Sequence, residues 1–527
     1  MIKRALFSVH DKTGLTPLAT ELQSQGWSID SSGGTAEHLQ QAGINVITVE
    51  EVTGFPAILG GRVKTLHPMI HGGILGQLDK QSDLDDLLRH GIKPYGLVGV
   101  NLYPFEKTIR QPGVTEEDAI ENIDIGGVAL IRAAAKNYRH VAVVTNIDQY
   151  SRIISDLQQH GEITLALRKQ LASEAYQYTA WYDTAIMNWM AQQEGVEVPL
   201  FPEKLILPYQ LVQKLRYGEN PHQQGALYRV PGFSIPSVVN ATQVWGKVPS
   251  ATTIGDLNAG VETVREMLNL RNFPHWNLAA VVIKHNTPCG LAVGDSPVET
   301  YVKAREADPL SAFGGVIALN FPIDAATAHE ICAIKVDGVI APGFADDQAL
   351  GVIQAAREKA KTPIFIIPEL VPLPTGSMNL KYVVGGLILQ QADLEPVKLN
   401  DWNVVTEKQV PDGQWKDILF GWLAIMHVRS NSVIVVKDGQ TLGIGSGQTS
   451  RIGSAKIALQ QAGEGAKGAI LISDGFCPFN DVVTEAAKCG IATVVQPGGS
   501  VNDKASIDAA NEHGLAMVFT GRRAFWH

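Results

Sequence analysis

Short apolar runs alternate with amphipathic helical stretches at both ends of the chain. This alternation limits the number of folds that the chain can adopt. Residues 5–9 predict a strand and residues 13–25 a helix, with Asp11 as its cap. Near the C-terminus, apolar runs at 469–473 and 491–496 predict strands separated by helices. Such regular alternation predicts layered α/β domains, with ligands at the carboxyl ends of the strands.

The same alternation continues towards the middle of the chain. Residues 95–100 and 141–145 predict buried strands. Between them, Thr115 with Asp118 three residues later predicts a capping box that opens a helix, and residues 130–137 predict another helix. These elements extend the layered α/β pattern.

The length of 527 residues predicts several domain-sized units. The segment 192–204 carries two prolines and mixed charge where a helical pattern stops. We therefore expect a domain at 1–195, a linker at 196–202 and a domain at 203–527. Four prolines between 363 and 378 predict a possible division of the larger domain. The residue pattern shows no convincing internal repeat.

Composition and charge exclude several classes of protein. The net charge is −10 with no block of like charge, which argues against a non-specific nucleic-acid binder. No apolar run reaches the roughly 18 residues of a membrane helix, and charge interrupts the start too early for a signal peptide. The cysteines have no C-x-x-C spacing, so neither a disulfide framework nor a structural zinc site is expected. We expect a soluble, cytoplasmic protein.

The segment Gly60–Pro68 concentrates groups that bind anions. Two glycines stand beside Arg62, Lys64, Thr65 and an imidazole, with neither strand nor helix periodicity. Glycines next to cations let backbone N–H groups and positive side chains converge on one anion. Taken alone, the segment is equally consistent with a basic surface turn.

Two further fragments each follow a predicted strand and open a predicted helix. They are Asp11–Gly14 and Ser32–Thr35, which bring hydroxyls, glycines and Lys12 to the start of a helix. A helix N-terminus with such groups is a favourable place for a phosphate. Either fragment alone is more often a helix cap, but beside Gly60–Pro68 they favour a phosphate pocket.

In the second half of the chain, Lys284 and His285 follow the apolar run 278–283. Ionisable side chains at the end of a buried strand are costly unless they are paired or used. A lysine beside a histidine in a low-dielectric pocket lowers both pKa values, which favours a neutral imidazole base next to an ammonium group. The alternative is a histidine whose nitrogens are satisfied by the backbone.

Two motifs that suggest other chemistry are incomplete. Pro288–Cys289 matches part of a zinc deaminase motif, but Ala292 stands where the second cysteine is needed and no H-x-E precedes it in register. The segment Gly443–Gln448 lacks the full glycine pattern of a dinucleotide-binding loop. We therefore expect neither a metal site nor a dinucleotide site.

Taken in order, the fragments match one family. The chain resembles, over essentially all 527 residues, the bifunctional purine biosynthesis proteins, in which an AICAR formyltransferase is fused to an IMP cyclohydrolase. The motifs that carry the resemblance are Gly60–Pro68, Asn101–Phe105, Ile123–Gly127, Arg216–Gln223, Lys284–Gly290, Ile340–Phe344, Arg429–Ser432, Gly447–Arg451 and Arg523–His527. The resemblance implies an N-terminal methylglyoxal-synthase-like layered domain and a larger C-terminal α/β domain of two cytidine-deaminase-like subdomains.

For the larger domain, the resemblance implies formyl transfer from 10-formyltetrahydrofolate to the amine of AICAR, giving formyl-AICAR. By analogy, His285 manages the proton and Lys284 stabilises the tetrahedral oxyanion. The residues that match nucleotide-holding positions are Arg216, Tyr217, Gly314, Asp337, Asn431, Arg451, Phe476 and Arg523. Those that match folate positions are Ile452, Asp481, Ser500 and Val501.

For the smaller domain, the resemblance implies closure of formyl-AICAR to IMP with loss of water. Because both reacting atoms belong to one molecule, positioning supplies much of the rate. The residues that match the catalytic cluster are Lys64, Tyr103, Asp124 and Lys136. Those that match nucleotide contacts are Asp11, Lys12, Ser32, Gly33, Gly34, Thr35, Arg62, Thr65, Asn101 and Ile125. Considered singly, Lys136 is as well explained as a solvated helix lysine and Asp124 as a helix cap.

The resemblance also implies a homodimer with the formyltransferase pocket between subunits, and no catalytic metal. His10 and Met426 stand where relatives often carry serine and lysine. We expect the nucleotide contact at His10 to be altered or made by the backbone, and we expect no charge contact at Met426. One alternative is a regulatory nucleotide-binding module, against which the six catalytic-type residues argue. Another is a metal-dependent hydrolase, for which the sequence offers no ligand set.

Overall fold

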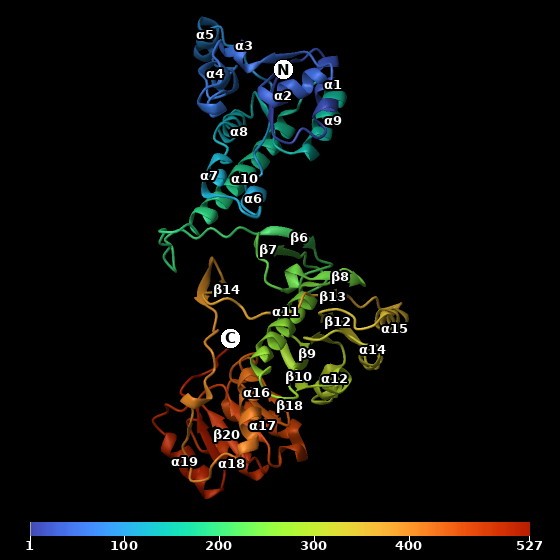
Figure 1. Ribbon diagram of the computed structural model, residues 1–527, viewed down its shortest axis with the longest axis vertical. Helices are drawn as coiled ribbons and strands as arrows, with labels where there is room; N and C mark the ends of the chain where they lie inside the picture. Colours follow the sequence, from blue (N-terminus) through green and yellow to red (C-terminus); the bar gives the residue numbers. More distant parts are fainter. Residues whose placement is uncertain (1) are drawn as a thin grey trace. The chain divides into compact units, whose positions relative to one another are not determined.

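The computed structural model describes residues 2–527, and the chain divides into two compact units, Met1–Pro208 and Tyr209–His527 (Figure 1). The first unit ends after its longest helix, α10 (Leu165–Met190), and the second opens on strand β6 (Gln210–Lys214). The predicted linker, 196–202, lies in the segment between these two elements. Within residues 2–527, no helix is both long enough and apolar enough to cross a membrane.

The first unit is built on a five-stranded parallel sheet with the strand order β3-β2-β1-β4-β5. Its strands are β1 (Arg4–Val9), β2 (Ser28–Ser31), β3 (Val46–Thr48), β4 (Leu97–Asn101) and β5 (Ala142–Val144). Its other helices are α1 (Leu15–Ser24), α2 (Gly33–Gln41), α3 (Val49–Thr53), α4 (Pro68–Leu75), α5 (Gln81–Arg89), α6 (Phe105–Thr108), α7 (Glu116–Glu121), α8 (Gly126–Lys136) and α9 (Tyr150–His160). The strands read as apolar runs because helices cover the sheet and bury them.

Two predicted caps have different outcomes. The capping box at Thr115 is confirmed, because its hydroxyl accepts the N–H of Asp118 while the Asp118 carboxylate accepts the N–H of Thr115. The prediction that Asp11 caps the first helix is wrong. Helix α1 begins after Gly14, and the Asp11 carboxylate accepts hydrogen bonds from the N–H and hydroxyl of Thr13 instead. Asp11 lies too far before the first helical turn to reach its free N–H groups.

The second unit is built on one twelve-stranded mixed sheet. Its order is β16-β21-β20-β19-β17-β18-β10-β9-β11-β12-β13-β8. The first half consists of β8 (Thr242–Trp245), α11 (Ala251–Glu266), β9 (Leu278–Lys284), β10 (Thr287–Gly294), α12 (Pro297–Glu306), α13 (Pro309–Ala312), β11 (Gly315–Leu319), α14 (Ala325–Cys332), β12 (Val336–Ala341), α15 (Asp347–Arg357) and β13 (Ile364–Ile366). The second half consists of β16 (Asn403–Val404), α16 (Trp415–Ile425), β17 (Val433–Lys437), β18 (Gln440–Gly445), α17 (Arg451–Ala462), β19 (Ile470–Ser473), α18 (Asp481–Lys488), β20 (Thr493–Gln496), α19 (Asp503–Glu512) and β21 (Ala516–Phe519).

The two halves of this unit repeat one topology. In each half a helix leads into an antiparallel hairpin, and three further strands follow on the far side of the hairpin's first strand. The orders β10-β9-β11-β12-β13 and β18-β17-β19-β20-β21 are therefore equivalent, and the halves join where β10 pairs with β18 (Figure 1). The expectation that the chain has no internal repeat is wrong at the level of topology.

The repeat extends to individual contacts. A methyl group on Gly260 of α11 would lie 2.7 Å from Ala318 of β11, and one on Gly421 of α16 would lie 2.2 Å from Ile472 of β19. Each glycine thus lets its helix pack closely on the equivalent strand. The shared residues are few and widely spaced, which is why the repeat is not visible in the sequence.

Two small sheets lie outside the large one. They are the pair β6–β7 (Gln210–Lys214 and Ala226–Arg229) and the pair β14–β15 (Met378–Val383 and Gly386–Gln391). The β14–β15 hairpin begins at the end of the proline-rich segment 363–378, which separates the two repeated halves.

Candidate active sites

In the first unit, the strand order places a topological switch point between β1 and β4. In parallel sheets, ligands bind at the carboxyl ends of the strands beside such a point. The loops that follow β1, β2 and β4 begin at His10, Ser32 and Leu102, so the predicted fragments around these positions share one edge of the sheet.

Asn101 holds two of these loops together. Its side-chain oxygen accepts the N–H groups of His10 and Asp11 at 2.6 and 2.9 Å, and its amide nitrogen donates to the Asp11 carbonyl at 2.8 Å. The His10 ring then lies 4.9 Å from the Tyr103 ring, centroid to centroid. At His10 the loop is thus organised through the backbone, while the imidazole packs on a predicted catalytic tyrosine.

The N-terminus of α2 has the features of a phosphate site. Ser32 is the N-cap residue, but no side chain caps the helix, and Gly33 follows with a φ of 50°. A methyl group on Gly33 would lie 3.8 Å from Lys64 Nζ, and one on Gly34 would lie 4.0 Å from Lys12 Cε. Two lysine side chains therefore flank the uncapped end of the helix, where the dipole also favours an anion. Thr35 instead bonds to the Val9 backbone.

Asp124 lies beside the same lysine. Burial raises the pKa of Asp124, opposed by the N–H of Gly127, by the charge of Lys64 and by the Tyr103 backbone. The Gly127 N–H donates to Asp124 Oδ1 at 2.6 Å. The structure thus brings Lys64, Tyr103 and Asp124 together, and Thr65 lies close by, 3.1 Å from a methyl group built on Gly126.

Two tyrosines of α10, neither of them predicted from the sequence, position these loops. The hydroxyl of Tyr178 accepts the N–H of Leu102 at 3.0 Å, and the hydroxyl of Tyr182 accepts the N–H of Asp124 at 2.8 Å. Burial raises the pKa of Tyr182 to about 12, so the phenol stays neutral. The four-residue spacing, which puts both rings on one helix face, was the available signal.

Three predicted residues of this unit have exposed side chains. Lys136 is exposed at the last position of α8, about 15 Å along the helix axis from its start beside Asp124. Arg62 forms a surface ion pair with Glu121 at 2.6 Å, a partner that the sequence analysis did not identify. Ile125 is the exposed N-cap residue of α8.

In the second unit, Lys284 and His285 stand at the tip of the β9–β10 hairpin. The turn has two residues, His285 and Asn286, with φ values of 56° and 58°. Positive φ at two residues other than glycine is uncommon, although two-residue hairpin turns of this type require it. The ammonium group of Lys284 donates to the Phe313 carbonyl at 3.0 Å.

The turn borders a cavity of about 200 Å³ where the two repeated halves meet. Lys284, His285 and Cys289 line it from the first half. Its remaining lining residues, which the sequence analysis missed as a site, are Thr287, Pro288, Asp308, Ser311, Ile444, Ser446 and Gln461. Burial raises the pKa of Cys289 to about 12, so this cysteine is a neutral thiol at pH 7.

Two predicted nucleotide residues lie at neighbouring strand starts. The N–H of Gly314 donates to the Lys335 carbonyl at 2.7 Å, which ties the start of β11 to the segment before Asp337. The Asp337 charge also acts on Asp256, a residue of α11 that contacts the turn. Gly314 and Asp337 therefore belong to the same end of the sheet as Lys284 and His285.

Arg216 and Tyr217 are placed by the beginning of α11. The guanidinium lies 4.6 Å from the centroid of the Tyr217 ring and donates to its hydroxyl at 3.0 Å. The Tyr217 carbonyl accepts the N–H of Ala251, the first residue of α11. A cavity of about 540 Å³ adjoins them, lined by Leu215, Gly218, Glu219, Gln223, Gln224, Gly225, Ala226 and Ala251.

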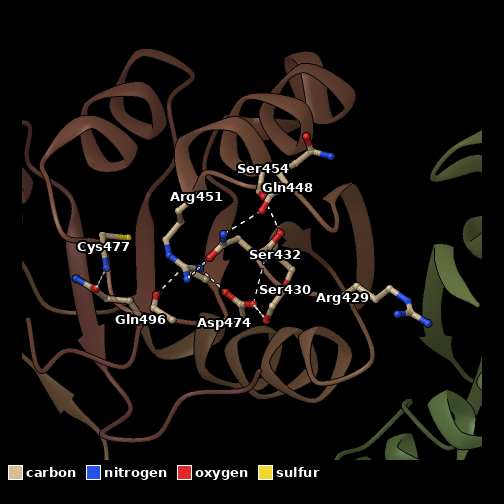
Figure 2. Close-up of polar contacts among 12 residues, drawn as sticks. Arg429, Ser430, Ser432, Gln448, Arg451, Ser454, Asp474, Cys477 and Gln496 are labelled. Atoms are coloured by element: carbon tan, nitrogen blue, oxygen red, sulfur yellow. Dashed lines mark hydrogen bonds and ion pairs between the residues drawn. The ribbon is translucent and has the colours of Figure 1, made fainter. Parts of the chain in front are cut away.

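Asn431 and Arg451 are organised by Asp474, a fully buried carboxylate that the sequence analysis missed. Figure 2 shows Arg451 and Ser430 directed at Asp474, whereas Arg429 points away from it. Arg451 also donates to Asn431 Oδ1 at 2.9 Å, and the Asn431 amide donates to the Gln448 carbonyl at 2.9 Å. Both predicted nucleotide residues are therefore held in fixed orientations at the end of β19.

The C-terminal tail joins this cluster. The N–H of Ala524 donates to the Asp474 carbonyl at 2.8 Å, and the N–H of Ser430 donates to the Trp526 carbonyl at 2.9 Å. These bonds bring Arg523, whose guanidinium lies 4.9 Å from the Phe525 ring centroid, towards Asn431 and Arg451. Phe476, two residues after Asp474, is 44% exposed and available to a ligand.

The predicted folate residues lie at three successive helix beginnings of the second half. Ile452 is in the first turn of α17, Asp481 is the first residue of α18, and Ser500 and Val501 precede α19. All four therefore lie at the edge where β19 and β20 end. Met426, in contrast, packs against the hydrophobic core at the end of α16.

Comparison with known proteins identifies the family. The model described as "AICARFT/IMPCHase bienzyme" matches residues 134–461, and the model described as "MGS-like domain" matches residues 14–129. The "Bifunctional purine biosynthesis protein PurH" of Oceanobacillus iheyensis is 44% identical over 527 residues, which is all of both chains. The protein of the same description from Rippkaea orientalis is 46% identical over 529 residues, again all of both chains.

The chain belongs to the AICARFT/IMPCHase bienzyme family. The predicted resemblance and fold class are thereby confirmed: an MGS-like N-terminal domain precedes a larger mixed α/β domain. The likeness of the larger domain to cytidine deaminases stays a prediction. A solved structure described as "Crystal structure of ForH" is 33% identical over 36% of this chain and all of its own, with a TM-score of 0.33, too low to bear on the fold.

Members of the AICARFT/IMPCHase family are bifunctional purine biosynthesis enzymes, which confirms the predicted enzyme class. Within residues 2–527, no group of three or more histidine, cysteine, aspartate or glutamate side chains is placed to hold a metal ion.

The raised pKa of Asp124 leads to a testable prediction about the stability of the first unit. Because the folded pKa lies above 3.8, the ionised carboxylate destabilises the first unit at neutral pH. Asp124→Asn keeps the acceptor for the Gly127 N–H and removes the charge, so we expect higher stability at pH 7. The gain should shrink as the pH falls and should vanish well below 3.8, where the wild-type carboxyl is protonated in both states.

Thermal unfolding of wild type and variant at a series of pH values measures this difference. Glu121→Gln serves as control, since Glu121 is an exposed partner of Arg62 at the surface. An Asp124→Asn protein that is less stable than wild type at pH 7 would contradict the assignment.

Proposed function

We propose that the chain catalyses the last two steps of IMP synthesis, one in each unit. The second unit transfers a formyl group from 10-formyltetrahydrofolate to AICAR, and the first unit closes formyl-AICAR to IMP. The observation that carries this proposal is that each unit contains its own cluster of catalytic-type residues. One is Lys64, Tyr103 and Asp124, and the other is the Lys284–His285 turn at its cavity.

In formyl transfer, the AICAR amine attacks the formyl carbon and forms a carbon–nitrogen bond. The amine proton passes to the imidazole of His285, and negative charge develops on the former carbonyl oxygen. The ammonium of Lys284 stabilises that charge with protons that its bond to the Phe313 carbonyl leaves free. The bond to the folate nitrogen then breaks, that nitrogen takes up a proton, and the carbonyl forms again.

The substrates of this step are held by the surroundings of the cavity. Arg216, Arg451 and Arg523 supply the positive charge for the nucleotide, and Asn431 and Phe476 supply hydrogen-bonding and apolar contact. Gly314 and Asp337 complete the nucleotide site at the end of the sheet that carries the turn. The folate lies at the edge formed by Ile452, Asp481, Ser500 and Val501. The reaction uses no catalytic metal.

In ring closure, the carboxamide nitrogen attacks the formyl carbon of the same molecule. Asp124 and Lys64 move the protons that this step and the loss of water require, and Tyr103 lies beside them. Because the reacting atoms are already tethered, the main task of the site is to fix the nucleotide. Lys12, Lys64 and the N-terminus of α2 hold its phosphate, with Ser32, Gly33 and Gly34 as the backbone donors.

The proposal predicts that single substitutions separate the two activities. His285→Ala or Lys284→Ala should lower formyl transfer by at least about 10²-fold, the range for loss of a general acid–base group, and leave cyclisation of supplied formyl-AICAR unchanged. Lys64→Ala should do the reverse, so that AICAR and 10-formyltetrahydrofolate yield formyl-AICAR that accumulates. Each reaction is measured separately by chromatography of the nucleotides, with a chelator present.

The matched control is Lys437→Ala. Lys437 occupies in the second hairpin the place that Lys284 has in the first, and it also donates to a backbone carbonyl, that of Lys467. Its loss should leave both activities near wild type. If His285→Ala abolishes both reactions in a folded protein, the assignment of one reaction to each unit is wrong.

We further propose that the chain acts as a homodimer in the cytoplasm. The hairpin β14–β15 is an isolated two-stranded sheet, which is marginally stable alone. Its exposed apolar residues include Tyr382 at 81% and Val384 at full exposure. Exposed apolar side chains in such a sheet are explained by burial against a second subunit.

The homodimer predicts a particle of twice 56.8 kDa in sedimentation equilibrium. Tyr382→Lys together with Val384→Lys should shift the population towards monomer, because two lysines cannot be buried without partners. A wild-type mass of one chain at micromolar concentration would rule the proposal out.

A further inference from the structure

The turn that carries His285 is held by a carboxylate from another element. Asp256 of α11 accepts the N–H of Asn286 at 2.6 Å through its Oδ1. Burial raises the pKa of Asp256, opposed by the N–H groups of Asn286 and His285 and by the His285 side chain. Asp337 acts in the opposite sense, as a like charge. The carboxylate therefore faces both turn residues and one predicted nucleotide residue.

In the second half of the unit, a helix aspartate also accepts a hydrogen bond from a hairpin turn. The β17–β18 hairpin has a two-residue turn, Asp438–Gly439, with φ values of 50° and 69°. Asp417 of α16 accepts the N–H of Gly439 at 2.7 Å. Burial raises the pKa of Asp417 too, and the N–H groups of both turn residues oppose the rise. A helix aspartate thus clamps the turn at equivalent places of both halves.

The two turns differ in the side chain at their first position and in their surroundings. The first offers His285 to a cavity, whereas the second has Asp438 at that position. Beside the second turn, the ring of Trp276 fills the space, because a methyl group on Gly439 would lie 3.1 Å from it. The clamp is common to both turns, but of the two only the first presents a histidine, and that histidine lines a cavity.

We propose that Asp256 is a positioning residue for formyl transfer: it fixes the His285–Asn286 turn so that the imidazole meets the substrate amine. The inference rests on the proposed role of His285. Two residues other than glycine resist positive φ, and the hydrogen bond to a charged acceptor offsets that cost. Without it, the turn relaxes and the imidazole leaves its place at the cavity. Asp256 itself transfers no proton in the reaction.

The test compares Asp256→Ala with Asp417→Ala, which removes the same contact from the turn that lacks the histidine. For Asp256→Ala we expect kcat of formyl transfer to fall by about 10- to 100-fold, the range for a displaced catalytic group, with KM for AICAR changed by less than about threefold. Asp417→Ala should keep kcat within about twofold of wild type. Cyclisation of supplied formyl-AICAR should be unchanged in both.

Conservative variants separate positioning from folding. Asp256→Asn retains an oxygen acceptor for the Asn286 N–H, so we expect it to recover most of the lost kcat. Asp256→Glu keeps the charge but moves the acceptor by one methylene, so kcat should fall as in Asp256→Ala. This variant replaces Asp256→Ala if the latter gives no soluble protein.

The outcomes distinguish this inference from the proposed function. If His285→Ala abolishes formyl transfer but Asp256→Ala and Asp256→Glu keep kcat within about threefold of wild type, the positioning role is wrong and the function stands. Equal losses of kcat in Asp256→Ala and Asp417→Ala would also overturn it, since they indicate general damage to the unit. If His285→Ala retains full transfer, the proposed role of His285 fails, and the inference with it.

Discussion

The second unit depends on a two-residue hairpin turn in a conformation that its residues do not favour. Positive φ at His285 and Asn286 costs of order 1 kcal/mol or more for each residue, so surrounding contacts must hold the turn. The β9–β10 ladder fixes its two ends, and the Asp256 carboxylate holds its middle. The turn is what places an imidazole and an ammonium side by side at the mouth of a cavity.

In the first unit, too, surrounding contacts hold the loops that carry the predicted site residues, but the geometry is different. There the parallel sheet brings three loops to one edge, and hydrogen bonds between side chains and the loop backbone fix their shape. Asn101 binds the backbone of the β1 loop, while Tyr178 and Tyr182 of α10 bind the backbone of the loops at Leu102 and Asp124. In both units, polar side chains hold the backbone of the loops that carry the predicted catalytic residues.

Much of this architecture could be predicted from the sequence. The strands β1 and β5 and the helix opened by Thr115 follow from local periodicity and capping, which need no long-range information. The phosphate-type loops were found because glycines, hydroxyls and lysines cluster at helix starts. The family resemblance added the assignment of Lys284 and His285 to a single reaction, formyl transfer.

What the sequence did not show depends on contacts between distant residues. Asp256 lies 30 positions before the residue it binds, and Asp474 organises Asn431 and Arg451 from another strand end. The internal repeat was hidden because its halves share a clamp aspartate, a close-packed glycine and a lysine before the turn, but few other residues. The position of Lys136 at the far end of α8 follows only once the helix is known to begin at Gly126.

The central claim is that two separate sites on one chain perform consecutive reactions. The most direct measurement mixes equal amounts of the His285→Ala and Lys64→Ala proteins with AICAR and 10-formyltetrahydrofolate and follows the nucleotides. Neither protein alone should form IMP, whereas the mixture should, because formyl-AICAR released by one protein is closed by the other. A mixture of folded proteins that forms no IMP would contradict it.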